Sequence, residues 1–230
     1  MNFFQWSELW GLIILLVIVI RAVAIHHIPK LLLCILWAVV ALCLLITLFI
    51  EFPLVECTTT KTTIWFIGSS VGLFYFSISY IQYKKKLRRS ISNYTLMIQE
   101  WMGTHKLRRK YEVRISTQIT SSSVSGILHP IILLPQKFNQ ENAVNLQKEL
   151  TCQYVHIQYF DPVIKFLFAI VLCIYWFNPL IWVMCILANR DIDLFCETCA
   201  ISSMSETGKF SYALFLINNS NDKTSTGNHM

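Results

Sequence analysis

Cys152, Gln153 and His156 are the residues whose types and spacing are best suited to chemistry. In a helix, positions 152 and 156 lie one turn apart and face the same way. At this spacing a helix can present two ligands to one metal ion, with the residue after the first ligand placed to act as a base. A thiolate and an imidazole both bind zinc. A lone histidine on a helix is more often structural, so the motif alone leaves both interpretations open.

The motif is one of four blocks that follow one another in the second half of the chain. Together they resemble the BlaR/MecR-type membrane metallopeptidases, bacterial antirepressor proteases whose best-known members sense β-lactams. The family patterns are G-x-x-x-P-x-I-x-x-P, HExxH-x-x-x-x-D, WFNP and E-x-x-C-D. The matching blocks are 126–135 (GILHPIILLP), 152–161 (CQYVHIQYFD), 176–182 (WFNPLIW) and 193–197 (DLFCE). With the apolar segments that precede them, the resemblance covers roughly residues 5–215.

The resemblance places Cys152, His156 and Asp193 at the three positions that bind zinc in the family. Thiolate, imidazole and carboxylate are all zinc ligands, so this altered set could still hold a metal ion. The aspartate is one methylene shorter than the family's glutamate and reaches less far, and a thiolate reduces the Lewis acidity of the ion. Asp161, which matches the family, and Glu197, which replaces an aspartate, stand at positions that support the ligands.

Gln153 stands where the resemblance implies the catalytic glutamate. An amide cannot take a proton from a zinc-bound water, and general-base catalysis is worth about 10²–10⁴ in rate. We therefore expect a zinc-peptidase scaffold that has lost both its zinc and its catalysis. Two alternatives stay open, namely an active zinc endopeptidase with a Cys/His/Asp site and a non-functional remnant of a sensor-transducer.

Three apolar segments precede the motif and predict a membrane protein. The chain is 55% hydrophobic and 14% charged, whereas soluble domains contain about 25% charged residues. Each segment has the length and composition of a spanning helix. The segments are residues 9–20, with a continuation past Arg21, residues 31–50 and residues 62–83. Arg21 is expected to snorkel to the nearer interface.

The loop charges predict the orientation of these helices. Five basic residues follow the third segment, at positions 84–86, 88 and 89, and Arg21 and Lys30 lie between the first two segments. The positive-inside rule therefore places the N-terminus outside and residues 84–161 in the cytoplasm. We expect these basic residues to contact anionic lipid rather than nucleic acid.

Residues 90–161 are predicted to form the cytoplasmic part, an α+β domain of the gluzincin type by resemblance. A basic linker at 90–110 precedes strands at 111–119 and 127–134 and a helix over about 141–160, capped by Asn139. Zinc peptidases of this type bind substrate as an added strand on a sheet edge. We expect the 127–134 strand to take this role, through Ile127, Ile131 and Leu133.

The second long apolar stretch, residues 166–189, contains Asn178-Pro179 at its centre. Proline breaks a helix there, and Asn-Pro favours a turn. If Asp193 is to meet Cys152 and His156, it must lie on the same side of the membrane, and about 25 residues are too few for two crossings. The sequence therefore predicts a re-entrant helical hairpin. The expected domains are 1–89 (three-span membrane domain), 90–161 (cytoplasmic metallopeptidase-like domain), 162–218 (hairpin and third-ligand helix) and 219–230 (polar disordered tail).

These observations together predict a mainly α membrane protein that acts as a catalytically inactive, regulatory pseudopeptidase in signal transduction. Its expected partners are membrane lipid and either an intact homologue or a repressor protein, with no direct contact to nucleic acid. The chain ends at Met230 without a penicillin-binding domain, so no β-lactam binding is expected.

Overall fold

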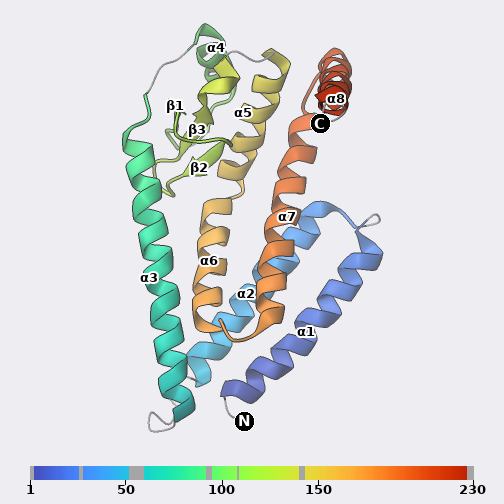
Figure 1. Cartoon of the computed structure of the whole chain (residues 1–230). Helices are drawn as coiled ribbons and strands as arrows, with labels where there is room; N and C mark the ends of the chain where they lie inside the picture. Colours follow the sequence, from blue (N-terminus) through green and yellow to red (C-terminus); the bar gives the residue numbers. More distant parts are fainter. Residues whose placement is uncertain are drawn as a thin grey trace. The chain divides into compact units, whose positions relative to one another are not determined.

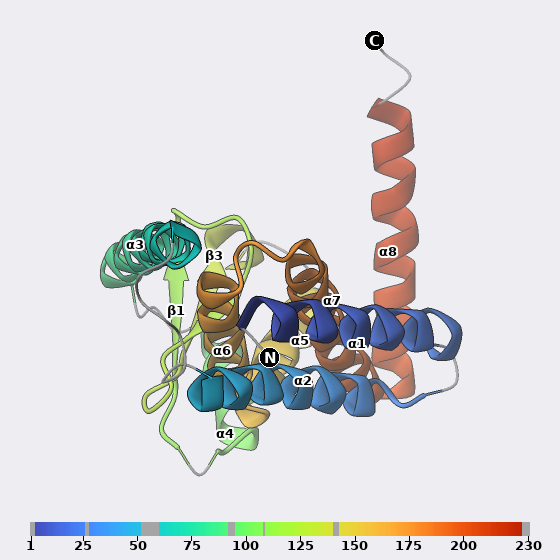
Figure 2. The same cartoon turned by 90° about the horizontal axis from the view of Figure 1, so that it is seen from below.

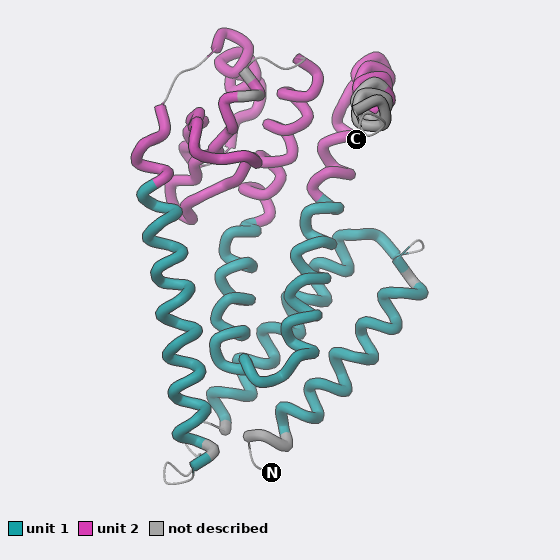
Figure 3. The backbone as a smooth tube through the Cα atoms, viewed as in Figure 1, with its two compact units in different colours: residues 1–85, 160–195 teal, residues 86–159, 196–230 magenta. Residues whose placement is uncertain are grey.

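The structure is a computed structural model in which α-helices dominate. It describes residues 3–25, 28–51, 60–91, 95–107, 109–139 and 143–226. The described part contains eight α-helices and three short strands, which confirms the predicted mainly helical fold. The chain divides into two compact units, residues 1–85 with 160–195 and residues 86–159 with 196–230 (Figure 3).

Three helices among the described residues are long and apolar enough to cross a membrane. They are α1 (Phe3–Ala24), α2 (Lys30–Glu51) and α3 (Thr60–Arg88). The helices α1 and α2 lie side by side (Figures 1 and 2). Many of their apolar side chains remain exposed, including Val23 and Phe49, which are 75% and 78% exposed. Lipid is the medium in which such surfaces are stable, so this is a membrane protein.

The helices α6 (Asp161–Ile174) and α7 (Pro179–Ser202) run in opposite directions and meet at the Asn-Pro turn (Figure 1). Pro179 begins α7, where its missing N–H costs nothing. The buried Asn178 accepts a hydrogen bond from the Leu180 N–H through Oδ1, at 3.0 Å. Its Nδ2 donates to the carbonyl oxygen and the hydroxyl of Ser7, at 3.0 and 3.2 Å. One asparagine therefore begins α7 and fastens it to the start of α1.

Arg21 is buried and forms an ion pair with Asp191 of α7, so the expectation that it snorkels to the interface is wrong. Its Nε donates to Asp191 Oδ2 at 2.7 Å, and its Nη2 donates to Oδ1 at 2.5 Å. Trp37 of α2 donates its indole N–H to the same Oδ2 at 2.8 Å. We call Arg21, Trp37 and Asp191 the Asp191 cluster. A paired charge avoids the cost that an isolated one has in an apolar interior, so burial is possible here.

Gly68 of α3 lies against the ring of Trp176, which stands in the turn before α7. A Cβ atom on Gly68 would lie 2.2 Å from Trp176 Cε2, far inside contact distance. Trp65 of α3 also donates its indole N–H to the carbonyl oxygen of Ile174, at 2.8 Å. The glycine therefore permits the close approach of α3 to the hairpin, as small residues do in membrane helix packing.

The variant Gly68→Ala is expected to lower the thermal stability of the detergent-purified protein by several degrees. The added methyl group would force the Trp176 ring to move, and overpacking typically costs about 1–3 kcal/mol. The matched control is Gly103→Ala, because a Cβ atom on this helical glycine meets nothing within 4 Å. Melting of both variants within error of the wild type would show that α3 does not need this glycine.

The second unit contains a three-stranded sheet together with several helices. The sheet order is β1 (Glu112–Ser116), β3 (Ile131–Pro135), β2 (Ser123–Ser125), with β1 parallel and β2 antiparallel to β3. The helices are α4 (Leu96–Thr104), α5 (Ala143–Gln158) and α8 (Glu206–Thr226). Apolar residues of α4, α5 and the sheet share one core, formed by Ile98, Trp101, Val113, Ile132, Leu134, Leu146, Leu150 and Ile157.

The predicted substrate strand is shorter than expected and occupies the wrong place in the sheet. It begins at Ile131 rather than residue 127, because Gly126 has a φ of +88° and turns the chain before Ile127. As β3 it is the central strand, and its backbone is hydrogen-bonded to β1 and β2 on its two sides. The expectation that a substrate strand adds along Ile127, Ile131 and Leu133 is therefore wrong, since addition requires a free edge.

Two further expectations differ from the structure at element ends. Asn139 closes a 3₁₀ helix, η2 (Gln136–Asn139), instead of capping α5, which begins at Ala143. The polar residues 219–226, which composition favours as a disordered tail, continue helix α8, and residues 227–230 lie outside the described part. The domain bounds at residues 89, 161 and 218 stay predictions.

Candidate functional site

Helix α5 positions the three motif residues. It places Leu146, Leu150 and Ile157 in the core of the second unit. Cys152, Gln153 and His156 are also buried, each less than 9% exposed. A helix at this position is what the motif requires, because only helical geometry brings positions 152 and 156 to one face.

Gln153 is held by a small polar group that sequence reasoning missed. Its Nε2 donates to the Ser122 hydroxyl at 3.1 Å and to Glu149 Oε1 at 3.2 Å. The Ser122 hydroxyl in turn donates to the same carboxylate oxygen of Glu149. Glu149 precedes Gln153 by one helical turn, which is the only sequence signal that could have found it. The amide therefore acts as a hydrogen-bond donor to a carboxylate, a role that an ionised glutamate could not fill.

Cys196 of α7 is the residue that the second unit brings to His156. Its Sγ lies 3.3 Å from His156 Nδ1, and the cysteine is fully buried. Cys196 belongs to the E-x-x-C-D block, but spacing alone could not say whether it joins the site. The proton between the two atoms can be carried by the thiol or by the imidazole, so the contact is a thiol–imidazole hydrogen bond of either polarity.

Two of the carboxylates predicted to complete the site, Asp193 and Glu197, form ion pairs within their own units. Asp193 is exposed in the first unit, where its Oδ1 lies 3.3 Å from Lys165 Nζ. Glu197, in the second unit, forms an ion pair with Lys148 of α5 at 3.0 Å. Asp161 is buried as the first residue of α6, directly after Phe160, which has a φ of +58°. Their predicted roles as a ligand (Asp193) and as supporting residues (Asp161, Glu197) stay predictions.

The donor set of the second unit fits zinc in kind but not in number. An imidazole nitrogen and a thiol sulfur are both good zinc donors, and His156 and Cys196 present one of each. Protein zinc sites use three or four such ligands. Gln153 also offers no base for a bound water. These two described residues alone do not make up a hydrolytic zinc centre, and no catalytic step is assigned to them.

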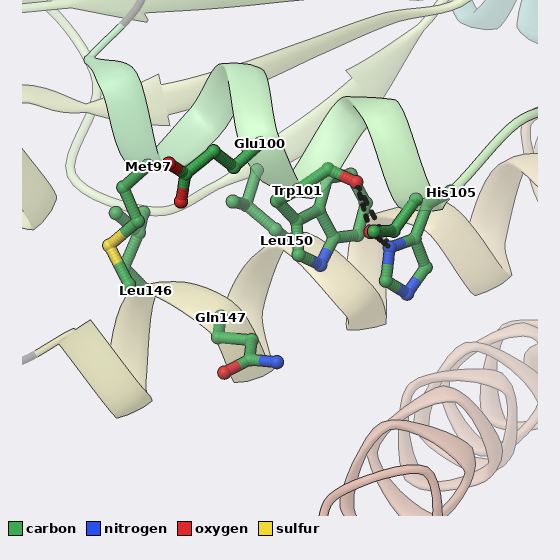
Figure 4. A pocket seen from close by; sticks show the side chains of 8 residues that line it. Met97, Glu100, Trp101, His105, Leu146, Gln147 and Leu150 are labelled. Carbon is green, nitrogen blue, oxygen red and sulfur yellow. Dashed lines mark hydrogen bonds between the residues drawn. The ribbon is translucent and has the colours of Figure 1, made fainter.

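A pocket of about 250 Å³ lies between α4 and α5 (Figure 4), and neither Gln153 nor His156 lines it. One wall is aromatic, because the rings of Trp101 and His105 stack at 4.3 Å. The indole N–H of Trp101 is covered and has no acceptor among the described residues. The pocket is lined by Met97, Glu100, Trp101, Thr104, His105, Leu146, Gln147 and Leu150.

Tyr111 supports this wall and carries a pH-dependent contribution to stability. Its hydroxyl donates to the carbonyl oxygen of His105 at 2.6 Å. Burial, with a smaller effect of Tyr154, raises the pKa of Tyr111 to about 12. Because the pKa in the folded state is raised, the contribution is fully present below pH 10 and is lost as pH rises from 10 through 12.

We therefore expect the wild type to lose stability between pH 10 and 12. The variant Tyr111→Phe should be less stable than the wild type at neutral pH. Between pH 10 and 12, however, it should lose less stability than the wild type does. Denaturant unfolding at a series of pH values measures both effects. The exposed Tyr159, changed to phenylalanine, is the control and should keep the wild-type profile. Equal alkaline slopes for Tyr111→Phe and the wild type would contradict the assignment.

Comparison with known proteins agrees with the family resemblance of the sequence. Residues 62–229 match the family model described as BlaR1 peptidase M56. The chain is also similar to the regulatory protein BlaR1 of Bacillus licheniformis, with 23% identity over 148 residues. That alignment covers 62% of this chain and 24% of the relative, so this chain spans less than two thirds of the relative's length. Because the family model covers most of the chain, the protein belongs to the BlaR1 peptidase M56 family.

Proposed function

We propose that this protein is a membrane-bound, peptidase-like regulatory protein that binds a peptide segment without hydrolysing it. The observation that carries the proposal is the environment of Gln153. Its amide stands at the general-base position and donates hydrogen bonds to Glu149 and Ser122. The general-base position is therefore occupied by a hydrogen-bond donor, the Gln153 amide, which has its own acceptors in Glu149 and Ser122.

The family and the named relative support a regulatory role in signal transduction. The similar protein of Bacillus licheniformis is named a regulatory protein. For this chain we propose the same class of role, exerted by holding a segment of a repressor or by pairing with an intact homologue. Binding of β-lactams and of nucleic acid is not part of the proposal.

The proposed topology has the N-terminus outside and residues 84–161 in the cytoplasm. Three candidate spans and the basic residues that follow α3 support it. The hairpin of α6 and α7 is proposed to enter the membrane from the cytoplasmic side and return, turning at Asn178-Pro179. The strands with the helix α5 support a gluzincin-like α+β domain, with β2 rather than β3 as the strand that receives a peptide.

Two features make β2 the better place for a bound segment. Among the described strands, β2 pairs on one side only, through Ser123, Val124 and Ser125 with β3. It also directly follows Ser122, whose hydroxyl contacts Gln153 and Glu149. A peptide added along β2 would therefore lie next to the altered general-base position, and main-chain hydrogen bonds would provide its affinity.

Photo-crosslinking to a mixed library of unstructured peptides tests this proposal. A benzoylphenylalanine at position Ser125, on β2, is expected to crosslink peptides that are recovered uncleaved. The matched control carries the same group at Glu112, on the opposite outer strand β1. Equal crosslinking from both positions would contradict binding at β2, and cleaved peptides would contradict the loss of catalysis.

Zinc is proposed to be absent from the working protein. The pairing of Asp193 with Lys165 supports this, because Asp193 stands at the family's third ligand position and its Oδ1 lies 3.3 Å from the ammonium group. The alternative of an active Cys/His/Asp zinc endopeptidase predicts about one zinc per chain, lost on His156→Ala. Metal analysis of the purified protein separates the two.

A further inference from the structure

The Asp191 cluster lies in the apolar core of the first unit, near the C-terminal end of α1. Arg21 lies within the candidate span Trp6–Val23, and Asp191 is 2% exposed. Both oxygens of the carboxylate are used, one by Arg21 alone and the other by Arg21 and Trp37 together. Ionisable residues inside membrane segments are rare and usually functional.

Stability alone does not explain a buried ion pair. Replacing such a pair with well-packed apolar residues is often neutral or stabilising, and the best-attested use of buried polar groups is to fix one register. Here the carboxylate is satisfied only when α1, α2 and α7 are all in their observed positions. Rotation of α7 by one residue would turn Asp191 away from both donors, because successive residues of a helix are separated by 100°.

A second polar contact fixes the other end of the same two helices. Asn178 binds Ser7 near the beginning of α1, and Asp191 binds Arg21 near its end. The contacts are 14 residues apart in α1 and 13 residues apart along α7, which correspond to about 21 and 20 Å at 1.5 Å per residue. This matched spacing means that α1 and α7 run parallel and are held together at two points. Sliding or rotating α7 against α1 requires at least one contact to break.

Helix α7 also carries the cysteine that contacts His156. It is continuous from Pro179 to Ser202, so Asp191 and Cys196 belong to one helix and are five residues apart. In the second unit, Cys196 is completely covered and hydrogen-bonded to His156. A change in the rotation of α7 would alter this contact directly.

We propose that the Asp191 cluster sets the register of α7 against the first two membrane helices, and so determines whether Cys196 stays covered beside His156. A displacement of α1 or α2 in the membrane would then reach the peptidase-like site through α7. The inference does not depend on hydrolysis or on bound metal. It assigns to Arg21, Trp37 and Asp191 the role of positioning residues.

The test is the rate at which a maleimide labels Cys196 in the full-length, reconstituted chain, read by peptide mass spectrometry so that all cysteines stay in place. Cys34 and Cys185, both buried in the first unit, report on unfolding. In the variant Asp191→Asn, Cys196 is expected to be labelled at least about tenfold faster than in the wild type, because removing one partner of a buried ion pair is strongly destabilising. Cys34 and Cys185 should stay protected in this variant. The control Lys165→Met breaks an exposed ion pair with α7 and should leave the rate unchanged.

A second variant separates register from stability. In Arg21→Met/Trp37→Phe/Asp191→Leu the cluster becomes wholly apolar, so folding is expected to persist while Cys196 is still labelled faster than in the wild type. This variant also decides the case if Asp191→Asn unfolds and exposes Cys34 and Cys185. Wild-type protection of Cys196 in the folded triple variant would overturn the proposal, as would unchanged labelling in a folded Asp191→Asn.

Discussion

The variant Gln153→Glu, which restores the family's general base, is expected to gain no peptidase activity and to lose stability at neutral pH. The new carboxylate would replace an amide that donates to Glu149 Oε1 at 3.2 Å. Two carboxylates at about 4 Å repel each other by on the order of 4 kcal/mol at the effective dielectric constant of a protein surface. Part of this is relieved by water or by protonation, so we expect a loss of about 1–3 kcal/mol in the free energy of unfolding.

The same substitution should make stability depend on pH in a defined direction. Repulsion raises the pKa of the carboxyl pair in the folded state above the ordinary glutamate value of about 4.3. The penalty is therefore absent below about pH 4 and grows as pH rises through the raised pKa. The double variant Glu149→Gln/Gln153→Glu exchanges donor and acceptor and is the control. Denaturant unfolding at pH 7 should show that this double variant regains most of the lost stability. A Gln153→Glu variant as stable as the wild type would contradict the assigned hydrogen bonds.

The variant Asn178→Ala is expected to destabilise the membrane unit strongly. It removes the acceptor of the Leu180 N–H and the donor to the carbonyl oxygen of Ser7, all in a buried turn. Each buried group left without a partner costs about 1–3 kcal/mol. Thermal melting in detergent, followed by loss of monodisperse protein, measures the effect.

A graded comparison shows whether the asparagine acts through these contacts. The variant Ser7→Ala removes only the hydroxyl that accepts from Asn178 Nδ2 at 3.2 Å and leaves the carbonyl oxygen of Ser7 in place. It should cost about 1 kcal/mol or less. If Asn178→Ala and Ser7→Ala have the same melting temperature, the stability of the turn does not depend on the side chain of Asn178.

The sequence was sufficient to predict the elements that repeat a simple physical pattern. The three membrane segments follow from uncharged runs of the right length, and the break before Pro179 follows from the missing N–H of proline. The helix that carries Cys152 and His156 follows from their spacing. The family follows from four blocks of residues in one order.

Contacts between distant parts of the chain could not be predicted in this way. The central position of β3 depends on β2, a three-residue strand of Ser, Val and Ser with no clear pattern. Arg21 finds Asp191 at a separation of 170 residues, and nothing local distinguishes this pairing from a snorkelling arginine. The partners of Gln153 and His156, namely Ser122, Glu149 and Cys196, became visible only when the helices and strands were placed within the second unit.

The most direct test of the central claim is a cleavage assay on purified wild-type protein in lipid nanodiscs with added zinc. The substrate is the mixed peptide library, and products are read by mass spectrometry beside His156→Ala. No cleavage above that of His156→Ala is expected, with or without zinc, because Gln153 cannot act as a base. Zinc-dependent cleavage by the wild type that His156→Ala abolishes would contradict it and would establish the protein as an active peptidase.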